Sequence, residues 1–142
     1  MTGSTASIFL WISTEPMAAH PPVDQMVSWV YTHDLEDTCR FYADMLGFEQ
    51  VRDEGAARIF QVSPSGFIGV CKAIGGRVVE PGGGMITVVT DDVDGWYARL
   101  EAAGAPLKGK PERLEQFGIY AFLAQDPNGY LIEFQQFLEG AD

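Results

Sequence analysis

The chain has 142 residues, of which 46% are hydrophobic and 20% charged, and its formal net charge is -11. This length suits one compact domain with a real core, and the composition argues against disorder or a fibrous repeat. Twenty acidic residues against nine basic ones would repel a phosphate backbone, so we expect no nucleic-acid partner.

The N-terminal segment, residues 1–25, is expected to be an arm and linker outside the domain. Its apolar stretch at residues 7–13, SIFLWIS, is too short to cross a bilayer and lacks the basic flank of a signal peptide. We therefore expect no membrane partner, and an arm that packs on the domain or on a second subunit. Residues 14–25 hold three of the eight prolines and are typical of a linker.

Cys39 and Cys71 lack metal or redox spacing, which favours a cytoplasmic protein.

Residues 26–48 and residues 84–105 follow the same order of features. Each reads as an alternating apolar strand, an Asp, a helix and a Gly, and a shift of 58 positions places Asp34 on Asp92. The two Asp carboxylates can accept hydrogen bonds from the first turn of a helix, and Gly47 and Gly104 can adopt the left-handed conformation that ends one. The sequence therefore predicts the same strand and helix twice.

Both predicted helices have one apolar face, because apolar residues recur at steps of four, three and four. In the first helix these residues are Leu35, Cys39, Tyr42 and Leu46, and in the second the corresponding positions are Val93, Tyr97, Leu100 and Gly104.

A hairpin is predicted after each helix, at the turn sequences Ser-Pro-Ser-Gly and Asp-Pro-Asn-Gly, residues 63–66 and 126–129. The glycine-rich stretch at residues 74–85 lacks the Lys-Ser/Thr of a phosphate loop and reads as a connector. The fold class is therefore α+β, with two βαβββ modules, residues 26–73 and 84–138, in one domain spanning residues 26–138. Residues 139–142 are expected to be a tail.

With the stretch D-L-E-D-T-C-R-F-Y-A-D-M-L-G-F at residues 34–48 and D-P-N-G-Y-L-I-E-F at residues 126–134, the chain resembles the glyoxalase/bleomycin-resistance/dioxygenase superfamily of vicinal oxygen chelate proteins. The resemblance covers residues 26–138. It implies that each module curls into a half-barrel of mixed sheet around a cleft, often completed in a homodimer. It is a poor guide to activity, since one fold hosts many chemistries.

In metal-dependent members of that family, one side chain from the first strand and one from the last strand of each module hold a divalent ion. The matching positions here are Val27, Gly69 or Val70, Met85 and Glu133. One carboxylate among apolar residues cannot hold such an ion tightly, so we expect neither a metal nor another cofactor. The only histidines, His20 and His33, stand in a linker and at a strand end, and His33 is expected to be idle.

The predicted pairing of residues 58–62 with 67–71 across Ser-Pro-Ser-Gly places Arg58 and Phe60 on the face of Phe67, Gly69 and Cys71, which should line the cleft. The same counting in the second module adds Tyr120 and Phe122 beside Glu133. The predicted ligand-binding residues are Trp29, Tyr31, Arg58, Phe60, Phe67, Tyr120, Phe122 and Glu133. The alternatives are that the aromatic residues form a core and that Glu133 is solvated or paired with Arg58.

These residues favour a metal-free protein that binds an aromatic or cationic small molecule by stacking and cation-π contact, in the manner of the bleomycin-resistance proteins. The alternative is a lyase or isomerase of the same superfamily, either with Glu133 as a metal-independent base or with metal ligands that were misassigned. A third possibility is an interaction or dimer scaffold in which residues 7–13 matter more than the cleft.

Overall fold

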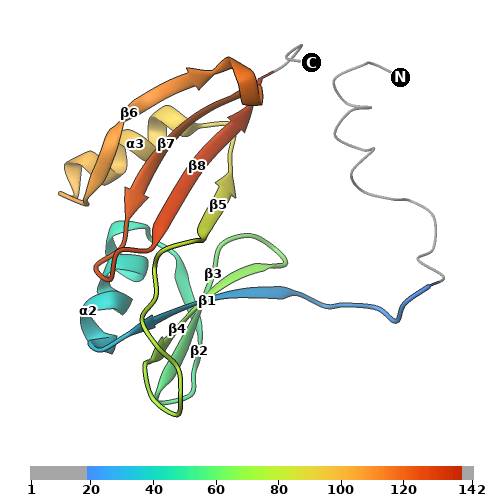
Figure 1. The fold of residues 1–142 in the computed structure, drawn as a ribbon, viewed down its shortest axis with the longest axis vertical. Coiled ribbons are helices and arrows are strands. Elements are labelled where there is room, and N and C mark those ends of the chain that lie inside the picture. The colour runs from blue at the N-terminus through green and yellow to red at the C-terminus, as the bar shows by residue number, and fades with distance from the viewer. Residues whose placement is uncertain (1–18, 139–142) are drawn as a thin grey trace.

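The computed structural model describes residues 19–138, which form two four-stranded mixed sheets with a helix packed on each (Figure 1). The fold is α+β, as the sequence predicts. The predicted arm at residues 7–13 and the predicted tail at residues 139–142 lie outside the described residues.

The first module forms one sheet with strand order β1-β4-β3-β2. β1 and β4 run parallel, and the other neighbours run antiparallel. Its elements are β1 (Met26–Thr32), α2 (Leu35–Arg40), the π-helical turn η1 (Phe41–Met45), β2 (Glu49–Asp53), β3 (Ala57–Gln61) and β4 (Gly66–Lys72).

The second module repeats this topology, with strand order β5-β8-β7-β6 and a parallel pair of β5 and β8. Its elements are β5 (Met85–Val89), α3 (Val93–Ala102), β6 (Leu107–Leu114), the 3-10 turn η2 (Glu115–Phe117), β7 (Ile119–Gln125) and β8 (Leu131–Phe137). The predicted duplication is therefore present at the level of strand order.

The helix ends are stabilised as the sequence predicts. The Asp34 carboxylate accepts a hydrogen bond from the Asp37 backbone N–H, and the Asp92 carboxylate accepts one from Gly95. At the other ends, Gly47 and Gly104 have φ of 78° and 75°, the left-handed conformation that glycine adopts most easily.

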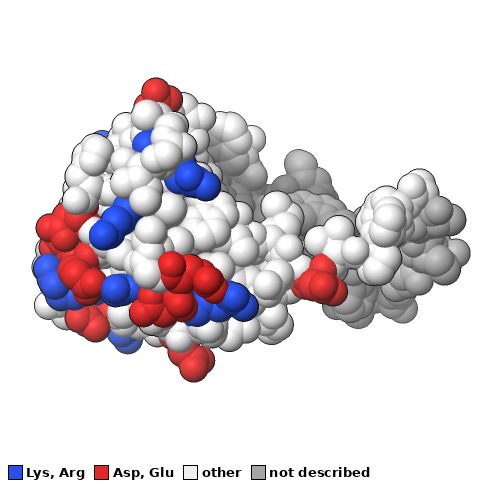
Figure 2. All heavy atoms as spheres, turned by 90° about the horizontal axis from the view of Figure 1, so that it is seen from below, with Lys and Arg blue, Asp and Glu red and all other residues white. Residues whose placement is uncertain are grey.

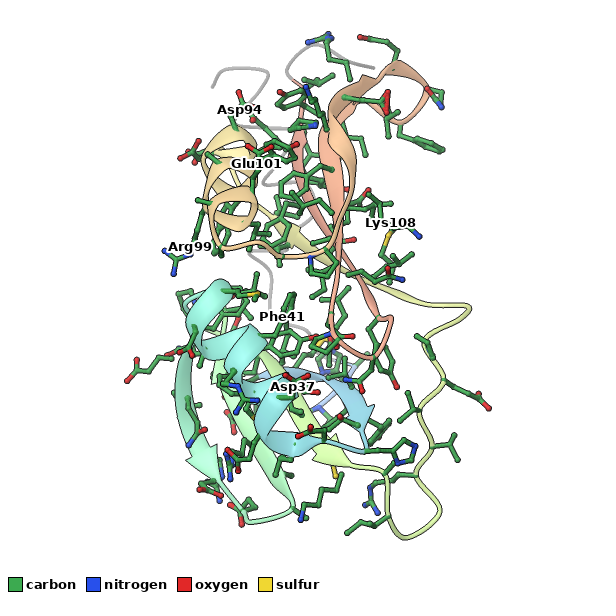
Figure 3. The ribbon with its side chains drawn as sticks, turned by 90° about the vertical axis from the view of Figure 1, so that its left-hand side faces the viewer. Asp37, Phe41, Asp94, Arg99, Glu101 and Lys108 are labelled. Carbon is green, nitrogen blue, oxygen red and sulfur yellow. The ribbon has the colours of Figure 1, made fainter. Side chains whose placement is uncertain are left out.

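One continuous hydrophobic core lies between the helices and the sheets and joins the two modules. Trp96 of α3 stacks on Phe134 of β8 and also contacts Phe48 of the first module. Arg99 of α3 donates a 2.9 Å hydrogen bond from Nε to the Met45 carbonyl, across the gap between the helical segments that Figure 3 displays. We call the sheet face that packs on this core the helix-covered face, and the opposite one the open face.

A buried polar link also crosses between the modules. The Tyr42 hydroxyl donates to Asp126 Oδ2 at 2.8 Å, and the Asn128 amide donates to Thr38 Oγ1 at 2.8 Å. Asp126 and Asn128 belong to the Asp-Pro-Asn-Gly turn, so this turn ties the second module to the first helix.

Charge is mixed on the surface of the first module. On the face that Figure 2 presents, acidic and basic side chains lie close together (Figure 2). The first module contains the ion pairs Arg52–Glu54 and Arg58–Glu36. Between residues 19 and 138, no helix is long and apolar enough to cross a membrane.

Candidate ligand-binding site

The register of the first hairpin decides which side chains share the open face. Arg58 pairs with Val70 and Phe60 pairs with Ile68, so both point to the helix-covered face. Phe60 is fully buried and packs against Tyr42. The predicted placement of Arg58 and Phe60 beside Phe67 is therefore wrong.

The second hairpin differs from its prediction in the same way. Phe122 pairs with Phe134, and their rings stack in the core with centroids 5.1 Å apart. Tyr120 pairs with Gln136, and its hydroxyl donates to Asp94 at the start of α3. This hydrogen bond raises the pKa of Tyr120, with burial as a second cause. Tyr120 and Phe122 thus also lie on the helix-covered face.

Both errors have one physical reason, which is the length of the turn. The first loop closes with Val62 N–H donating to the Gly66 carbonyl, and the second with Asp126 N–H donating to that of Tyr130. An odd number of residues lies between these closing pairs, whereas the prediction assumed an even number. A slip of one residue moves every side chain of a strand to the opposite face.

Arg58 is used inside the first module. Its guanidinium pairs with Glu36 of α2 at 2.8 Å and lies 3.6 Å from Asp53 of β2. The hydrogen bond from Arg58 lowers the pKa of Glu36. Arg58 therefore ties the helix to the sheet, and it is not the partner of Glu133.

The open face of the first module carries Trp29, Tyr31, Phe67, Gly69 and Cys71, as the pairings of β1 with β4 require. The Trp29 ring covers Gly69, because a Cβ at position 69 would come closer than 3.0 Å to three atoms of that ring. Trp29 nevertheless remains 40% exposed. The glycine thus provides the space in which a large, accessible aromatic surface lies against the sheet.

Glu133 lies on the open face of the second module, beside Thr87 of β5 and Leu123 of β7. Thr87 Oγ1 donates a 3.0 Å hydrogen bond to Glu133 Oε1. The Glu133 carboxylate is partly exposed, and its hydrogen-bond partner Thr87 is neutral. Glu133 is therefore a polar group on the open face that is not part of an ion pair with a described residue.

The residues at the family's metal-ligand positions do not fit a metal. Val27 and Met85 offer no oxygen or imidazole donor, and any side chain at Gly69 would collide with the Trp29 ring. Within the described part of the chain, no group of three or more His, Cys, Asp or Glu residues is placed to hold a metal ion. Glu133 and Thr87 alone would leave such an ion mostly hydrated.

Three adjoining cavities meet at Trp29. One of about 260 Å³ is lined by Tyr31, Ala57, Cys71 and Arg77 as well as Trp29, and one of about 430 Å³ adds residues of the connector and Tyr130. A third, of about 360 Å³, extends beneath residues 80–84 of the connector toward Met85 and Leu131. Trp29 is thus the aromatic surface that these cavities share.

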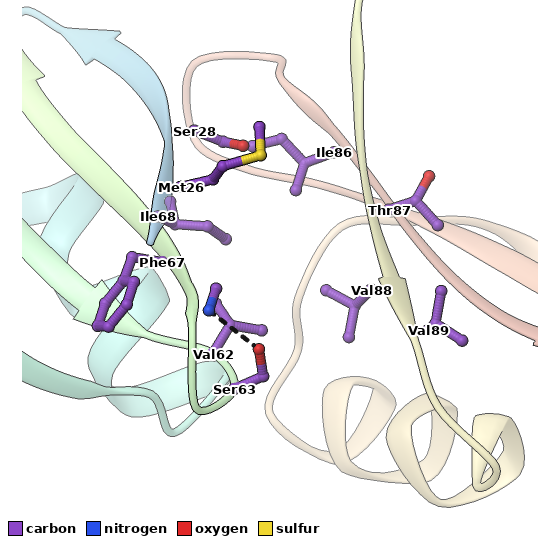
Figure 4. A pocket seen from close by; sticks show the side chains of 11 residues that line it. Met26, Ser28, Val62, Ser63, Phe67, Ile68, Ile86, Thr87, Val88 and Val89 are labelled. Carbon is purple, nitrogen blue, oxygen red and sulfur yellow. Dashed lines mark hydrogen bonds between the residues drawn. The ribbon is translucent and has the colours of Figure 1, made fainter. Parts of the chain in front are cut away.

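A separate groove of about 300 Å³ runs between β1 and β4 on one side and β5 on the other, and Figure 4 shows its mostly apolar lining. Phe67 belongs to this groove and not to the cavities at Trp29. Of the eight predicted residues, the cavities at Trp29 bring together Trp29 and Tyr31. Glu133 lies on the same open side, in the other module.

Arg77 and Tyr130 were missed by the sequence reasoning, although both line the cavity of about 430 Å³. Arg77 was missed because residues 74–85 were interpreted only as a connector. The Gly-Gly pair immediately before Arg77 is a turn signal, and this turn sets the direction of the chain at Arg77. Tyr130 directly follows the Asp-Pro-Asn-Gly turn, and only the correct turn length reveals which way it points.

This geometry agrees with sequence and structure comparisons. A model of the Glyoxalase/Bleomycin resistance protein/Dioxygenase superfamily matches residues 23–134. The chain belongs to this superfamily. Its two βαβββ modules agree with this membership.

Several solved structures resemble the chain over most of its length. A glyoxalase/bleomycin resistance protein/dioxygenase from Nocardioides has 22% identity and a TM-score of 0.68, covering 97% of this chain and 95% of that one. Lactoylglutathione lyase from Agrobacterium tumefaciens has 26% identity and a TM-score of 0.65, covering 82% and 95%. TioX from Micromonospora sp. ML1 has 22% identity and a TM-score of 0.67, covering 80% and 98%.

No protein of curated function matches the sequence. The structural likenesses therefore establish the fold, and the function has to be argued from the open face itself.

Proposed function

We propose that this superfamily member is a metal-free binding protein for a planar aromatic small molecule. The observation that carries the proposal is the Trp29 ring, which lies flat enough on Gly69 to exclude a side chain there and stays accessible at the junction of three cavities. Aromatic rings favour stacked or edge-to-face partners, and mostly apolar cavities with a few polar groups are typical of small-molecule sites.

The ligand set supports the metal-free part of the proposal. A divalent ion needs several oxygen or imidazole donors, and Val27, Gly69 and Met85 supply none. Metal analysis of the purified protein tests this directly. Zinc, nickel, iron or manganese at one ion per chain would overturn it.

A thermal-shift screen of planar aromatic compounds tests the binding role. Compounds that raise the melting temperature of the wild type should lose that effect with Trp29→Ala. Phe117→Ala is the matched control, because Phe117 is 69% exposed and lines none of the cavities at Trp29. Stabilisation that survives Trp29→Ala unchanged would contradict the proposal.

A second candidate is a lyase or isomerase with Glu133 as general base. The observation in its favour is the partly exposed carboxylate on the open face, oriented by the Thr87 hydroxyl. Substitution of Glu133 by Gln separates the two roles. If the protein is an enzyme with Glu133 as its base, Glu133→Gln should abolish turnover of the ligand. If the protein only binds its ligand at Trp29, the variant should keep most of the ligand affinity.

The proposed binding unit is a homodimer. Large apolar side chains on the open face of the second module, Met85 and Val89, are each more than half exposed in the single chain. Such a surface favours coverage by a second copy of the chain. Light scattering coupled to size-exclusion chromatography tests this, and a monomeric mass would overturn it.

We place the protein in the cytoplasm, since Cys39 and Cys71 are both free and buried.

A further inference from the structure

The connector folds back over the open face immediately after the first module. Gly75 and Gly76 have φ of 60° and 84°, and Arg77 N–H donates to the Ile74 carbonyl at 3.1 Å. Two successive positive φ values are those of a type I′ turn, which glycine adopts at little cost. This turn carries Arg77 to the cavities that Trp29 and Tyr31 line.

The charge of Arg77 is available to a ligand. Four other arginines, Arg40, Arg52, Arg58 and Arg113, pair with carboxylates, and Arg99 donates to the Met45 carbonyl. Among residues 19–138, Arg77 has no carboxylate partner, and its side chain donates only one long hydrogen bond, 3.4 Å, to the Ile74 carbonyl. In a chain with twenty acidic residues, Arg77 is thus a guanidinium without a described carboxylate partner that lines two cavities together with Trp29 and Tyr31.

Tyr130 supplies a second donor to the same cavity. Its hydroxyl oxygen accepts hydrogen bonds from the backbone N–H groups of Tyr31 at 3.3 Å and Glu80 at 3.2 Å. These bonds fix the oxygen and hold the connector against β1. The O–H hydrogen finds no acceptor in the described part of the chain, so it is left for a ligand.

We propose that this cavity selects a planar aromatic ligand that carries a carboxylate. The ring lies against Trp29, and the carboxylate accepts hydrogen bonds from the Arg77 guanidinium and the Tyr130 hydroxyl. A guanidinium matches a carboxylate with two parallel hydrogen bonds, which gives orientation as well as affinity. This inference rests on the proposed function and narrows its ligand to an aromatic acid.

Glu80 is the charged group that opposes an anion here, because it lines the same cavity. Its replacement by Gln therefore serves as a variant with the opposite expected effect. Glu80→Gln should strengthen the binding of an aromatic acid, whereas Arg77→Gln should weaken it.

Isothermal titration with three probes of nearly equal shape tests the inference. The probes are 2-naphthoate, its neutral amide 2-naphthamide, and the cation 2-naphthylmethylammonium. We expect 2-naphthoate to bind wild-type protein about tenfold or more tightly than the amide, which corresponds to about 1.4 kcal/mol. Arg77→Gln should remove this preference, and Tyr130→Phe should reduce it. Arg113→Gln, at an arginine of β6 paired with Glu115, is the matched control.

The outcomes separate the inference from the proposed function. Equal affinity for 2-naphthoate and its amide, or an unchanged preference in Arg77→Gln, overturns the inference and leaves aromatic binding intact. Tighter binding of the cation also overturns it. If none of the three probes binds, the proposed function fails and this inference fails with it.

Discussion

The Tyr42 hydroxyl in the first module donates a 2.8 Å hydrogen bond to Asp126 Oδ2 in the second, inside the core that the modules share. Asp126 also accepts hydrogen bonds from the backbone N–H groups of Asn128 and Tyr130. The turn that identifies the family at sequence level is therefore also the polar joint between the two halves of the fold. Since Tyr130 directly follows this turn and its N–H donates to Asp126, the same contacts also position one wall of the ligand cavity.

Tyr42→Phe should lower the free energy of unfolding by about 1–3 kcal/mol, because it leaves a buried carboxylate with one donor fewer. Urea denaturation followed by circular dichroism measures the change. Tyr97→Phe is the matched control, since the Tyr97 hydroxyl donates to Glu101 on the exposed side of α3, and its loss should have little effect. Equal stability of Tyr42→Phe and wild type would show that the joint contributes nothing.

The pH dependence of stability should reveal Asp126. Burial raises the pKa of Asp126 above its ordinary 3.8, although hydrogen bonds from Tyr42 and from the turn oppose the shift. A carboxyl whose pKa is raised by folding stabilises the fold fully below its unfolded pKa, and this contribution is lost as pH rises through the folded pKa. Wild type should therefore gain stability relative to Asp126→Asn as pH falls from 7 to 4. A difference that stays constant over this range would contradict the assignment.

Gly69→Ala should displace the Trp29 ring and weaken aromatic binding. The added methyl group would come closer than 3.0 Å to three ring atoms, and overpacking of this kind costs about 1–3 kcal/mol. The indole N–H signal of Trp29 in a two-dimensional NMR spectrum should shift, together with a lower unfolding free energy. Phe117→Ala is the control, because Phe117 is 69% exposed and lines none of the cavities at Trp29. An unmoved Trp29 signal would refute the stacking.

Arg58→Met should lower stability without changing ligand affinity, because Arg58 lies on the helix-covered face and pairs with Glu36. The pKa of Glu36 should rise toward its ordinary 4.5 once this partner is removed, which an NMR titration can follow. Arg113→Met removes an ion pair whose two side chains are both largely exposed, so it should alter stability less. A loss of ligand affinity in Arg58→Met would instead support the open-face placement that the sequence suggested.

The sequence predicted local structure well because the relevant interactions are local. Asp34 and Asp92 cap helices, and Gly47 and Gly104 end them, through contacts within a few residues. The superfamily followed from the same signals. These features need no knowledge of how strands pair.

The candidate site was only half predictable because it depends on register. Phe60 and Phe122 were assigned to the open face, and the odd length of the two turns places both in the core. Arg77 and Tyr130 come from a connector and a turn, and only the three-dimensional structure brings them to Trp29. Composition and periodicity do not indicate which distant residues line the same cavity.

The binding of an aromatic ligand at Trp29 should not require a metal. The most direct test is calorimetric titration of a stabilising aromatic compound into protein dialysed against EDTA, into protein supplied with nickel or zinc, and into Trp29→Ala. We expect the same Kd with and without metal, and an affinity lower by about tenfold or more in the variant, as for the truncation of a stacking residue. Binding that disappears after EDTA, or that persists unchanged in Trp29→Ala, would contradict it.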